Sequence, residues 1–268
     1  MKLGQQVWLI GGTRESAVLA RAIAAIPASC VITVTTAAAA ALYPEVEPLT
    51  LWVGRLRPET LDQFLQQQRI GAILDASHPF AVTISQLAIA AAVKHQLPYL
   101  RYERPAVADE LADSSSRSAR TVESYAALFE QAGLLGQRAL LTIGYRALAQ
   151  FRPYQTKATL FARILPSAVA LEAALAAGFS PARLIAIRPP LSLALERALW
   201  QQWQISTVVA KASGSAGGEA IKRQLATELN VQLWLIRRPE VAYPQVAKTL
   251  SEAISFCRAF ATDSISSG

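Results

Sequence analysis

The stretch QVWLIGGTRESAVLARAIAAI (residues 6–26) joins a short apolar run, a glycine turn and an apolar face at helical spacing. Residues 6–10 predict a buried β-strand that ends at Gly11-Gly12-Thr13. From residue 14 to residue 26 the apolar side chains recur every three to four positions, which predicts an amphipathic helix. A strand, a tight turn and a helix in this order are typical of α/β proteins with a parallel sheet.

The same succession repeats along the chain. Further strands are predicted at residues 31–35, 49–53, 72–75 and 98–102, and then at residues 139–143, 159–164, 184–187, 207–210 and 232–236. Helical patterns separate these strands, and a last one runs from Gln245 to about Phe260. Strands that alternate with helices imply mostly parallel, doubly wound sheets. The predicted fold class is α/β, with two Rossmann-like lobes and a cleft between them.

A polar, serine-rich stretch, DELADSSSRSAR (residues 109–120), interrupts this pattern and is the most loop-like part of the chain. It predicts an N-terminal lobe over residues 1–105, a linker over 106–120 and a C-terminal lobe over 121–268. The pattern leaves open whether a terminal strand or helix of one lobe packs into the other.

Composition excludes several classes of protein. With 268 residues and 52% hydrophobic content the chain has ample core, which excludes an intrinsically disordered protein. No apolar run approaches the roughly 20 residues of a membrane span, and the short run before Gly11 is not typical of a signal peptide. Cys30 and Cys257 match no paired-ligand spacing, so neither a disulfide framework nor a zinc site is indicated. We therefore expect a cytoplasmic protein without a metal.

The net charge of +7 favours a small anionic ligand over nucleic acid, because the chain has no run of four or more Lys/Arg. Cations instead recur at predicted turns: Arg14, Arg55, Arg104, Arg146, Arg163, Arg188, Lys211 and Arg237. Tyr-x-x-x-Lys, Gly-x-Ser-x-Gly and His-Glu-x-x-His are absent from the sequence, which argues against short-chain dehydrogenases, serine hydrolases and zinc hydrolases.

Two turns of the N-terminal lobe are candidates for binding a dinucleotide. Gly11-Gly12-Thr13-Arg14 could hold a pyrophosphate at a helix N-terminus, although an ordinary strand-to-helix turn explains it nearly as well. At the end of the second strand stand Thr35-Thr36, where NAD-selective folds often place an acid. Two hydroxyls there favour NADPH, unless they are simply β-branched residues that finish a strand.

Two further turns are candidates for the reacting end of the site. In DASHPFA (residues 75–81) we expect His78 to be mostly neutral at a helix N-terminus, unless His78 or Ser77 merely caps that helix. The segment KASGSAGG (residues 211–218) joins a lysine to small residues before a helix, as an anion cradle does. A surface loop is the alternative for this segment.

Taken together, the turns resemble one known family. The motifs occur in order as GGTRES (11–16), VGRL (53–56), DASHPFA (75–81), LPYLRYERP (97–105), LLTIGYRALAQF (140–151), RILP (163–166), KASGSAGGEAIK (211–222) and LIRRP (235–239). This succession resembles the precorrin-6A reductase family of cobalamin biosynthesis, including its cobalt-precorrin counterpart. The resemblance spans nearly the whole chain, and DASHPFA is its most specific part.

The resemblance implies an oxidoreductase that acts on a CH–CH group and delivers hydride from NADPH, with NADH as the alternative, to the C18=C19 bond of an anionic tetrapyrrole. The residues implied to bind the cofactor are Gly11, Gly12, Thr13, Arg14, Thr35, Thr36, Gly54 and Arg55. Those implied to bind the substrate are Ser77, His78, Thr142, Gly144, Arg146, Lys211, Ser213 and Gly214. No catalytic residue, metal or membrane partner is implied, and the oligomeric state is left open.

The chain departs from the family pattern in its second half. Lys211-Ala212-Ser213-Gly214 stands where the family has K-D-S-G, and Ile143 and Tyr145 flank Gly144 where the family has L-T-T-G-R. Because an acid is missing at Ala212, the alternative function is a dinucleotide-binding sensor, or another two-lobed binding protein, without turnover.

Overall fold

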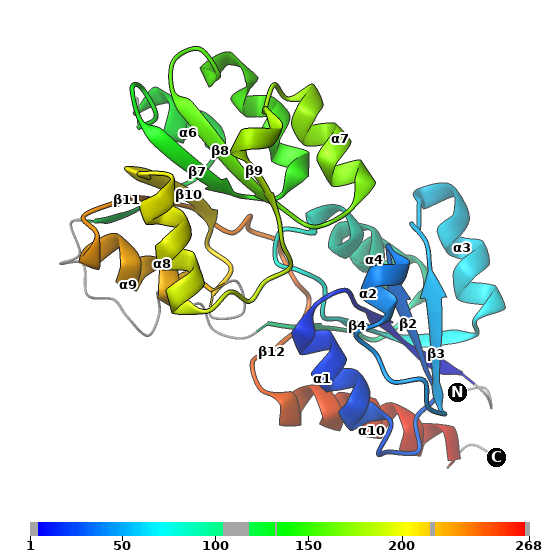
Figure 1. Ribbon diagram of the computed structural model, residues 1–268. Coiled ribbons are helices and arrows are strands. Elements are labelled where there is room, and N and C mark those ends of the chain that lie inside the picture. Colours follow the sequence, from blue (N-terminus) through cyan, green and yellow to red (C-terminus); the bar gives the residue numbers. More distant parts are fainter. Residues whose placement is uncertain (1–4, 104–117, 132, 215–217, 266–268) are drawn as a thin grey trace. The chain divides into compact units, whose positions relative to one another are not determined.

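The computed structural model describes residues 5–103, 118–131, 133–214 and 218–265. The chain divides into two compact units, one formed by Met1–Arg104 with Pro239–Gly268 and the other by Pro105–Arg238. Each unit is built on one six-stranded sheet in which the described strand pairs are all parallel (Figure 1). The predicted α/β class with two Rossmann-like lobes is confirmed.

The first sheet has the strand order β12-β5-β4-β1-β2-β3. Its strands are β1 (Gln6–Ile10), β2 (Cys30–Val34), β3 (Leu49–Val53), β4 (Ile70–Asp75), β5 (Tyr99–Tyr102) and β12 (Val246–Ala247). The helices of this unit are α1 (Arg14–Ile23), α2 (Ala37–Ala40), α3 (Pro58–Gln67), α4 (Val82–His95) and α10 (Leu250–Ile265).

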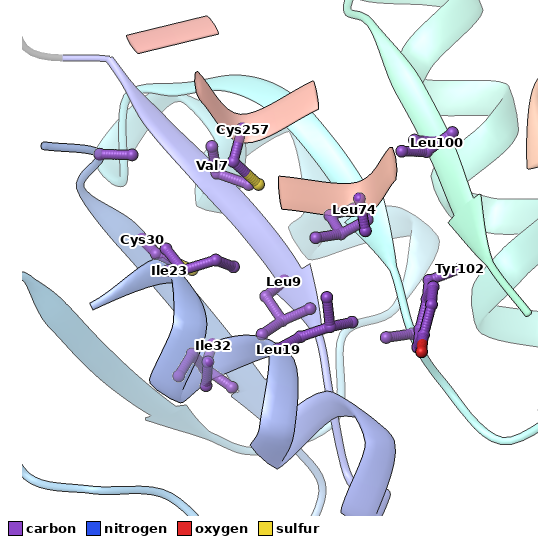
Figure 2. Packing of buried hydrophobic residues seen from close by; sticks show 14 of the residues in the cluster. Val7, Leu9, Leu19, Ile23, Cys30, Ile32, Leu74, Leu100, Tyr102 and Cys257 are labelled. Carbon is purple, nitrogen blue, oxygen red and sulfur yellow. The ribbon is translucent and has the colours of Figure 1, made fainter. Parts of the chain in front are cut away.

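Helices cover both faces of the first sheet, which explains why its strands are mostly apolar. On one face, residues of the sheet pack with α1 and α10; Figure 2 shows Val7, Leu9, Leu19, Leu74 and Cys257 in this cluster. The cluster on the other face joins the sheet to α3 and α4 and includes Trp8, Phe64, Ile73 and Ala88. Neighbouring residues of β1 therefore point into opposite layers of the core.

The second sheet has the order β6-β11-β10-β7-β8-β9. Its strands are β6 (Ala119–Val122), β7 (Arg138–Thr142), β8 (Thr159–Ile164), β9 (Leu184–Ala186), β10 (Thr207–Lys211) and β11 (Gln232–Ile236). Its helices are α6 (Tyr125–Glu130), α7 (Ala168–Ala176), α8 (Leu193–Gln202) and α9 (Glu219–Glu228), with 3₁₀ helices η1 (Tyr145–Tyr154) and η2 (Pro181–Arg183). Buried Leu140, Val208 and Leu233 of the sheet share a cluster with Trp200 and Leu225.

The two sheets exchange their sixth strands. In a sheet of this order the sixth strand ordinarily follows the fifth along the chain. Here β6 follows β5 but pairs with β11 of the second sheet, whereas β12 returns to pair with β5 of the first. Backbone bonds from Arg101 N to Gln245 O (2.9 Å) and from Glu103 N to Ala247 O (3.0 Å) hold β12 in place.

The exchange moves the boundary expected from the sequence. The expected C-terminal lobe of residues 121–268 ends instead at Arg238, because β12 and α10 pack on the first unit. Most of the expected linker, 106–120, lies outside the described residues, and its last two positions begin β6. The last helix begins at Leu250 and not at Gln245, because Val246 and Ala247 are paired as a strand.

Among the described residues, no helix has both the length and the apolar character that a membrane span requires.

Candidate functional site

Strands β1 and β4 are neighbours at the point where the strand order of the first sheet reverses. In such sheets ligands bind beyond the carboxyl ends of the strands at this point. The turns that follow the two strands are joined directly: Ala76 N donates to Ile10 O (3.1 Å), and the Thr13 hydroxyl donates to Ala76 O (3.1 Å). The structure therefore brings the predicted glycine turn and the predicted Ser77-His78 turn together at one edge.

The glycine turn is closed around Tyr43, a residue that the sequence analysis missed. Gly12 N donates to the Tyr43 hydroxyl (2.6 Å), which also lies 2.6 Å from Ser16 Oγ. Burial raises the pKa of this phenol, so it remains protonated over the physiological range. Thr13 caps α1 and donates its own N–H to Ser16 Oγ (3.0 Å). The N–H groups of Gly12 and Thr13, expected to face a phosphate, thus donate within the protein.

Gly11→Ala is expected to lower the free energy of unfolding by about 1–3 kcal/mol, since overpacking a filled site costs about that much. A Cβ at this position would lie 2.4 Å from the Tyr43 hydroxyl and 3.1 Å from Ile32 Cγ2. Urea unfolding measures the effect, and Tyr43→Phe is the matched partner. The double variant Gly11→Ala, Tyr43→Phe should lose less stability than the two single variants together, because the Tyr43 oxygen that the new Cβ would meet is absent. Strictly additive losses would contradict this account.

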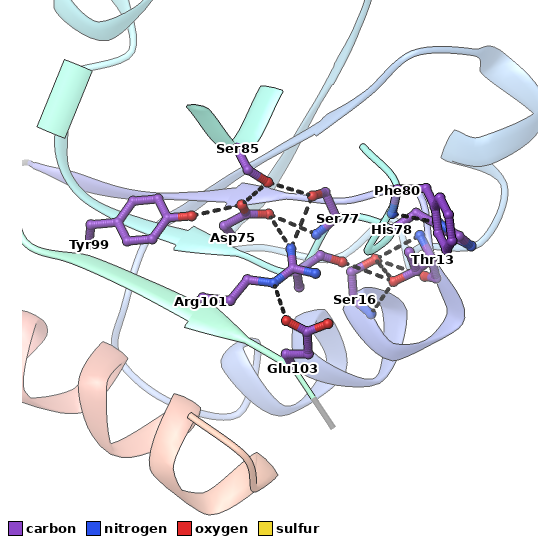
Figure 3. A network of polar contacts seen from close by, with 11 residues as sticks. Thr13, Ser16, Asp75, Ser77, His78, Phe80, Ser85, Tyr99, Arg101 and Glu103 are labelled. Carbon is purple, nitrogen blue, oxygen red and sulfur yellow. Dashed lines mark hydrogen bonds and ion pairs between the residues drawn. The ribbon is translucent and has the colours of Figure 1, made fainter. Parts of the chain in front are cut away.

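The buried carboxylate of Asp75 anchors the Ser77-His78 turn. Asp75 is 0% exposed and accepts hydrogen bonds from Ser77 N (3.0 Å), Ser85 Oγ (2.6 Å), Tyr99 Oη (2.8 Å) and Arg101 Nη1 (2.9 Å) (Figure 3). Arg101 is 1% exposed and forms a buried ion pair with Asp75. A buried carboxylate with this many donors is well satisfied, so it acts as a rigid anchor for the turn.

Ser77 and His78 have different places in this turn. Ser77 is buried, and its hydroxyl accepts a hydrogen bond from Arg101 Nη1 (3.1 Å), so it belongs to the Asp75 network. His78 is exposed, and its Nδ1 accepts from Phe80 N (3.2 Å). When the imidazole is neutral its proton is therefore on Nε2. Of the two predicted substrate residues in this turn, only His78 is exposed.

The ends of β2 and β3 place the remaining predicted cofactor residues side by side. Gly54 N donates to Val34 O (2.9 Å), so Gly54-Arg55 runs next to Thr35-Thr36. The Thr36 hydroxyl accepts from Ala39 N (3.2 Å) and caps the short helix α2. Thr35 and Thr36 are both exposed, and no acidic residue occupies either position. The edge is therefore compatible with a phosphorylated ribose.

The second sheet has its own point of reversal, between β7 and β10. Thr142 pairs with Ala210 across the two strands, and its hydroxyl donates to Val209 O (3.3 Å). Gly144, which follows β7, has a φ of +81° that side chains rarely adopt. The predicted substrate residues Thr142, Gly144, Arg146, Lys211, Ser213 and Gly214 all lie on the ends of β7 and β10 or on the segments that follow them.

Lys211 and Arg146 form the cationic part of this edge. Burial lowers the pKa of Lys211, and the nearby positive charge of Arg146 lowers it further. Two cations close enough to repel each other favour an anion that contacts both.

The loop after β10 is tied by an internal acid. Gly214 N donates to Glu219 Oε2 (3.0 Å), and the other oxygen of Glu219 pairs with Arg223 one helical turn later. The expected anion cradle at Lys211–Gly214 is therefore partly occupied by the protein's own carboxylate. Ser213 donates its hydroxyl to Lys211 O (3.3 Å), and residues 215–217 of the expected cradle lie outside the described residues.

A buried polar cluster beside this loop was not predicted from the sequence. Glu196 (3% exposed) forms an ion pair with Arg163, and Lys222 (4% exposed) donates to Gly218 O (3.3 Å). Burial lowers the pKa of Lys222 to about 8, and the positive charge of Arg163 adds to this shift. Lysines are rarely so buried unless they are paired. The sequence did not predict the burial of Lys222, because a lysine in the first turn of a helix is ordinarily exposed.

Lys222 should produce a measurable pH dependence of stability. Between its native pKa of about 8 and its ordinary value of 10.5, the unfolded chain binds more protons at this lysine, so the free energy of unfolding rises with pH. Relative to Lys222→Met, wild type should gain about 2–3 kcal/mol from about pH 7 to about pH 10. Urea unfolding across this range measures the difference. Lys94→Met, an exposed control, should parallel wild type; a parallel Lys222→Met curve would contradict the assignment.

Among the described residues, no three His, Cys, Asp or Glu side chains lie close enough to share a metal ion. Both cysteines are buried, and burial raises the pKa of each thiol. They belong to the core between the first sheet and its helices.

Comparisons with known proteins agree with this architecture. The family model for precorrin-6x reductase CbiJ/CobK matches residues 6–258. A cobalt-precorrin-6A reductase of Synechocystis sp. is 45% identical over 252 residues, which cover 94% of this chain and 95% of that protein. The cobalt-precorrin-6A reductase of Priestia megaterium is 31% identical over 92% of this chain and 96% of its own. A solved structure of CobK precorrin-6A reductase superposes with a TM-score of 0.75 at 25% identity, covering 96% of this chain and 97% of that one. The chain therefore belongs to the precorrin-6x reductase CbiJ/CobK family.

Proposed function

We propose that the chain catalyses the NAD(P)H-dependent reduction of the macrocycle of precorrin-6A, or of its cobalt-bound form, to the dihydro product in cobalamin biosynthesis. The observation that carries this proposal is the match to reductases over nearly the whole chain, both in sequence and in fold. The site residues described above supply the chemistry that such a reaction requires of a protein.

The carboxyl edge of the first sheet fits a dinucleotide. Gly11 leaves no space for a side chain beside Tyr43, and Gly12 has a φ of +100°. Thr35 and Thr36 offer hydroxyls without a repelling carboxylate, and the cation Arg55 follows Gly54 beside them. When bound, a reduced nicotinamide supplies the hydride. The protein's part is to hold that ring in one orientation.

The Asp75 network serves this orientation. It fixes the backbone of Ser77 through one hydrogen bond to the carboxylate, and the side chain of Ser77 through Arg101. His78 then projects from an anchored turn, and its Nδ1 accepts from Phe80 N. Anchored groups catalyse by positioning, because small displacements of reacting groups are costly in rate.

The carboxyl edge of the second sheet fits the substrate's acidic side chains. Lys211 and Arg146 present two neighbouring cations, and Gly144 gives a backbone turn without a side chain. A macrocycle that carries several carboxylates would be bound by such charges and oriented by them.

Anaerobic incubation of the purified protein with precorrin-6A or cobalt-precorrin-6A, in parallel with NADPH and NADH, tests the proposal. We expect loss of the reduced-nicotinamide absorbance and a product heavier by two hydrogen atoms. Omission of the macrocycle is the control, because it separates reduction of the substrate from oxidation of the cofactor by other routes. Cofactor binding without a change in the mass of the macrocycle would overturn the proposal in favour of a binding protein without turnover.

A further inference from the structure

The Asp75 network of the first unit receives one more residue from a distant part of the chain. Residues 239–245 lead from the second unit back to β12. The carbonyl oxygen of Gln245 accepts from Arg101 N (2.9 Å), which fixes the end of this segment beside β5. Two residues earlier, the ring of Tyr243 lies under the guanidinium of Arg101, with 5.1 Å between the guanidinium carbon and the ring centroid. A segment that returns from the second unit therefore contacts a buried charge of the first.

Tyr243 lies in the same layer of the first unit as the Asp75 network. Side chains of β5 alternate between the faces of the sheet, so Tyr99 and Arg101 point to the face that α3 and α4 cover. Tyr243 is partly buried against the cluster on that face. Burial raises the pKa of Tyr243, and the positive charge of Arg101 lowers it. The negative charges of Asp75 and Glu103 raise it again, so all three charges act on this phenol.

Arg101 is a buried cation, and Tyr243 contributes to its environment. Arg101 is 1% exposed, and its Nη1 donates to Asp75 Oδ1 (2.9 Å) and to Ser77 Oγ (3.1 Å) (Figure 3). Its Nε lies 3.5 Å from Glu103 Oε2. An aromatic face attracts a cation, and the attraction is stronger when both are removed from water. The ring of Tyr243 thus holds the guanidinium from a direction that no carboxylate occupies, and its removal would admit water to the ion pair.

Arg101 connects Tyr243 to the Ser77-His78 turn. It donates to the side chain of Ser77, and its ion-pair partner Asp75 accepts from Ser77 N (3.0 Å). His78 is the next residue of the same turn. Resting on the proposed function, we propose that Tyr243 is a positioning residue: its ring fixes Arg101, and through Arg101 it sets the orientation of the Ser77-His78 turn for the reduction. A residue of the returning segment therefore belongs to the site of the first unit.

The chain has two histidines, and they provide a probe of this turn that needs no turnover. NMR of isotope-labelled imidazoles in the full chain reports on His78, and His95, which is paired with Asp62, is the internal reference. The variant His95→Gln assigns the signals, because only those of His78 remain. In Tyr243→Leu we expect the His78 signals to move by more than a linewidth, while the His95 signals stay in place. Tyr243→Phe keeps the ring and should show both histidines as in wild type.

Steady-state kinetics with the macrocycle then tests whether this positioning serves the reaction. Tyr243→Leu is expected to lower kcat about tenfold and to leave KM for the macrocycle within about threefold, because misplaced groups cost rate more than binding. Tyr243→Phe should have a kcat within about twofold of wild type, because the aromatic face over Arg101 is retained. Tyr243→Met also lacks the ring and takes the place of Tyr243→Leu if that variant does not fold.

The matched control is Phe260→Leu, which also removes an aromatic ring from the part of the chain that returns to the first unit. Phe260 is buried on α10 and lies against Gly71, the second residue of β4, at the opposite end of that strand from the Ser77-His78 turn. The control should keep the His78 signals and kcat of wild type, even where thermal unfolding shows a loss of stability.

Three outcomes would overturn the role of Tyr243. These are unchanged His78 signals in Tyr243→Leu, a loss of kcat in Tyr243→Phe as large as in Tyr243→Leu, and an equal loss of kcat in Phe260→Leu. Absence of turnover by wild type would instead count against the proposed function. The His78 signals would then still decide whether Tyr243 holds the turn, because they are measured without substrate.

Discussion

Asp75→Asn is expected to lower the free energy of unfolding by about 3–5 kcal/mol, the range found when one partner of a buried ion pair is removed. The carboxylate is 0% exposed and its partner Arg101 is 1% exposed. Water therefore cannot solvate the positive charge that the substitution leaves unpaired on Arg101. The amide of asparagine would also point hydrogen atoms at donors such as Tyr99 and Ser85, which now donate to the same oxygen of Asp75. Urea unfolding followed by far-ultraviolet circular dichroism measures the loss.

Two further variants separate the charge from the hydrogen bonds. Ser85→Ala removes one donor and no charge, so it should cost only about 1 kcal/mol. Arg101→Met added to Asp75→Asn removes the orphaned guanidinium, and the double variant should be less destabilised than the sum of the two single variants. If Asp75→Asn costs no more than Ser85→Ala, the buried ion pair is not the anchor of the Ser77-His78 turn.

Lys211→Met is expected to weaken binding of the macrocycle by about 10- to 100-fold, the range for one lost charge-assisted contact with a carboxylate. Lys211 lies at the end of β10, where burial and Arg146 lower its pKa. A lysine whose pKa is lowered loses its charge at a lower pH than an exposed one. Wild-type affinity for the macrocycle should therefore fall with rising pH before an ordinary lysine would titrate. Equilibrium binding of the macrocycle as a function of pH measures both effects.

Two control variants distinguish the effect of the positive charge of Lys211 from the effect of its position. Lys211→Arg retains a cation and should recover most of the affinity, without the early loss at alkaline pH. Lys157→Met removes an exposed lysine that precedes β8, at the opposite edge of the second sheet, and should bind as wild type does. Unchanged affinity of Lys211→Met for the macrocycle would remove this residue from the substrate site.

Most of the fold could be predicted from the sequence because both faces of each sheet are covered. A strand buried on both sides is an unbroken apolar run, and runs such as residues 232–236 are visible without any structure. Two of the edge strands, β6 and β12, were not predicted, for the opposite reason. β12 is only two residues long, and Arg120 and Thr121 make β6 too polar to suggest a strand. Their pairing is set by partners more than a hundred residues away in the chain, which local patterns do not reveal.

The candidate site could be predicted in its location more than in its contacts. Turns after strands indicated Gly12, His78 and Lys211 as candidates, because the topology of a doubly wound sheet gathers such turns at the carboxyl edge of each sheet. Tyr43 and Glu219 were missed, although each accepts a hydrogen bond from a backbone N–H that a ligand was expected to use. A hydrogen-bond acceptor from a distant part of the chain, such as Tyr43 for Gly12 N, cannot be predicted from the local periodicity of the sequence. Arg101 did leave a signal: an arginine inside the apolar strand YLRY requires a buried acid nearby.

The exchange of β6 and β12 has a consequence for biosynthesis. A ribosome delivers β5 well before β12, and at ordinary elongation rates the interval is on the order of ten seconds to half a minute. During that time the outer edge of β5 presents unpaired backbone groups, as an aggregation-prone edge does. The second sheet needs only β6 to β11 and can be complete earlier. Synthesis of the first unit therefore begins before that of the second unit and ends after it. The edge of β5 remains open to aggregation until β12 has left the ribosome and paired with it.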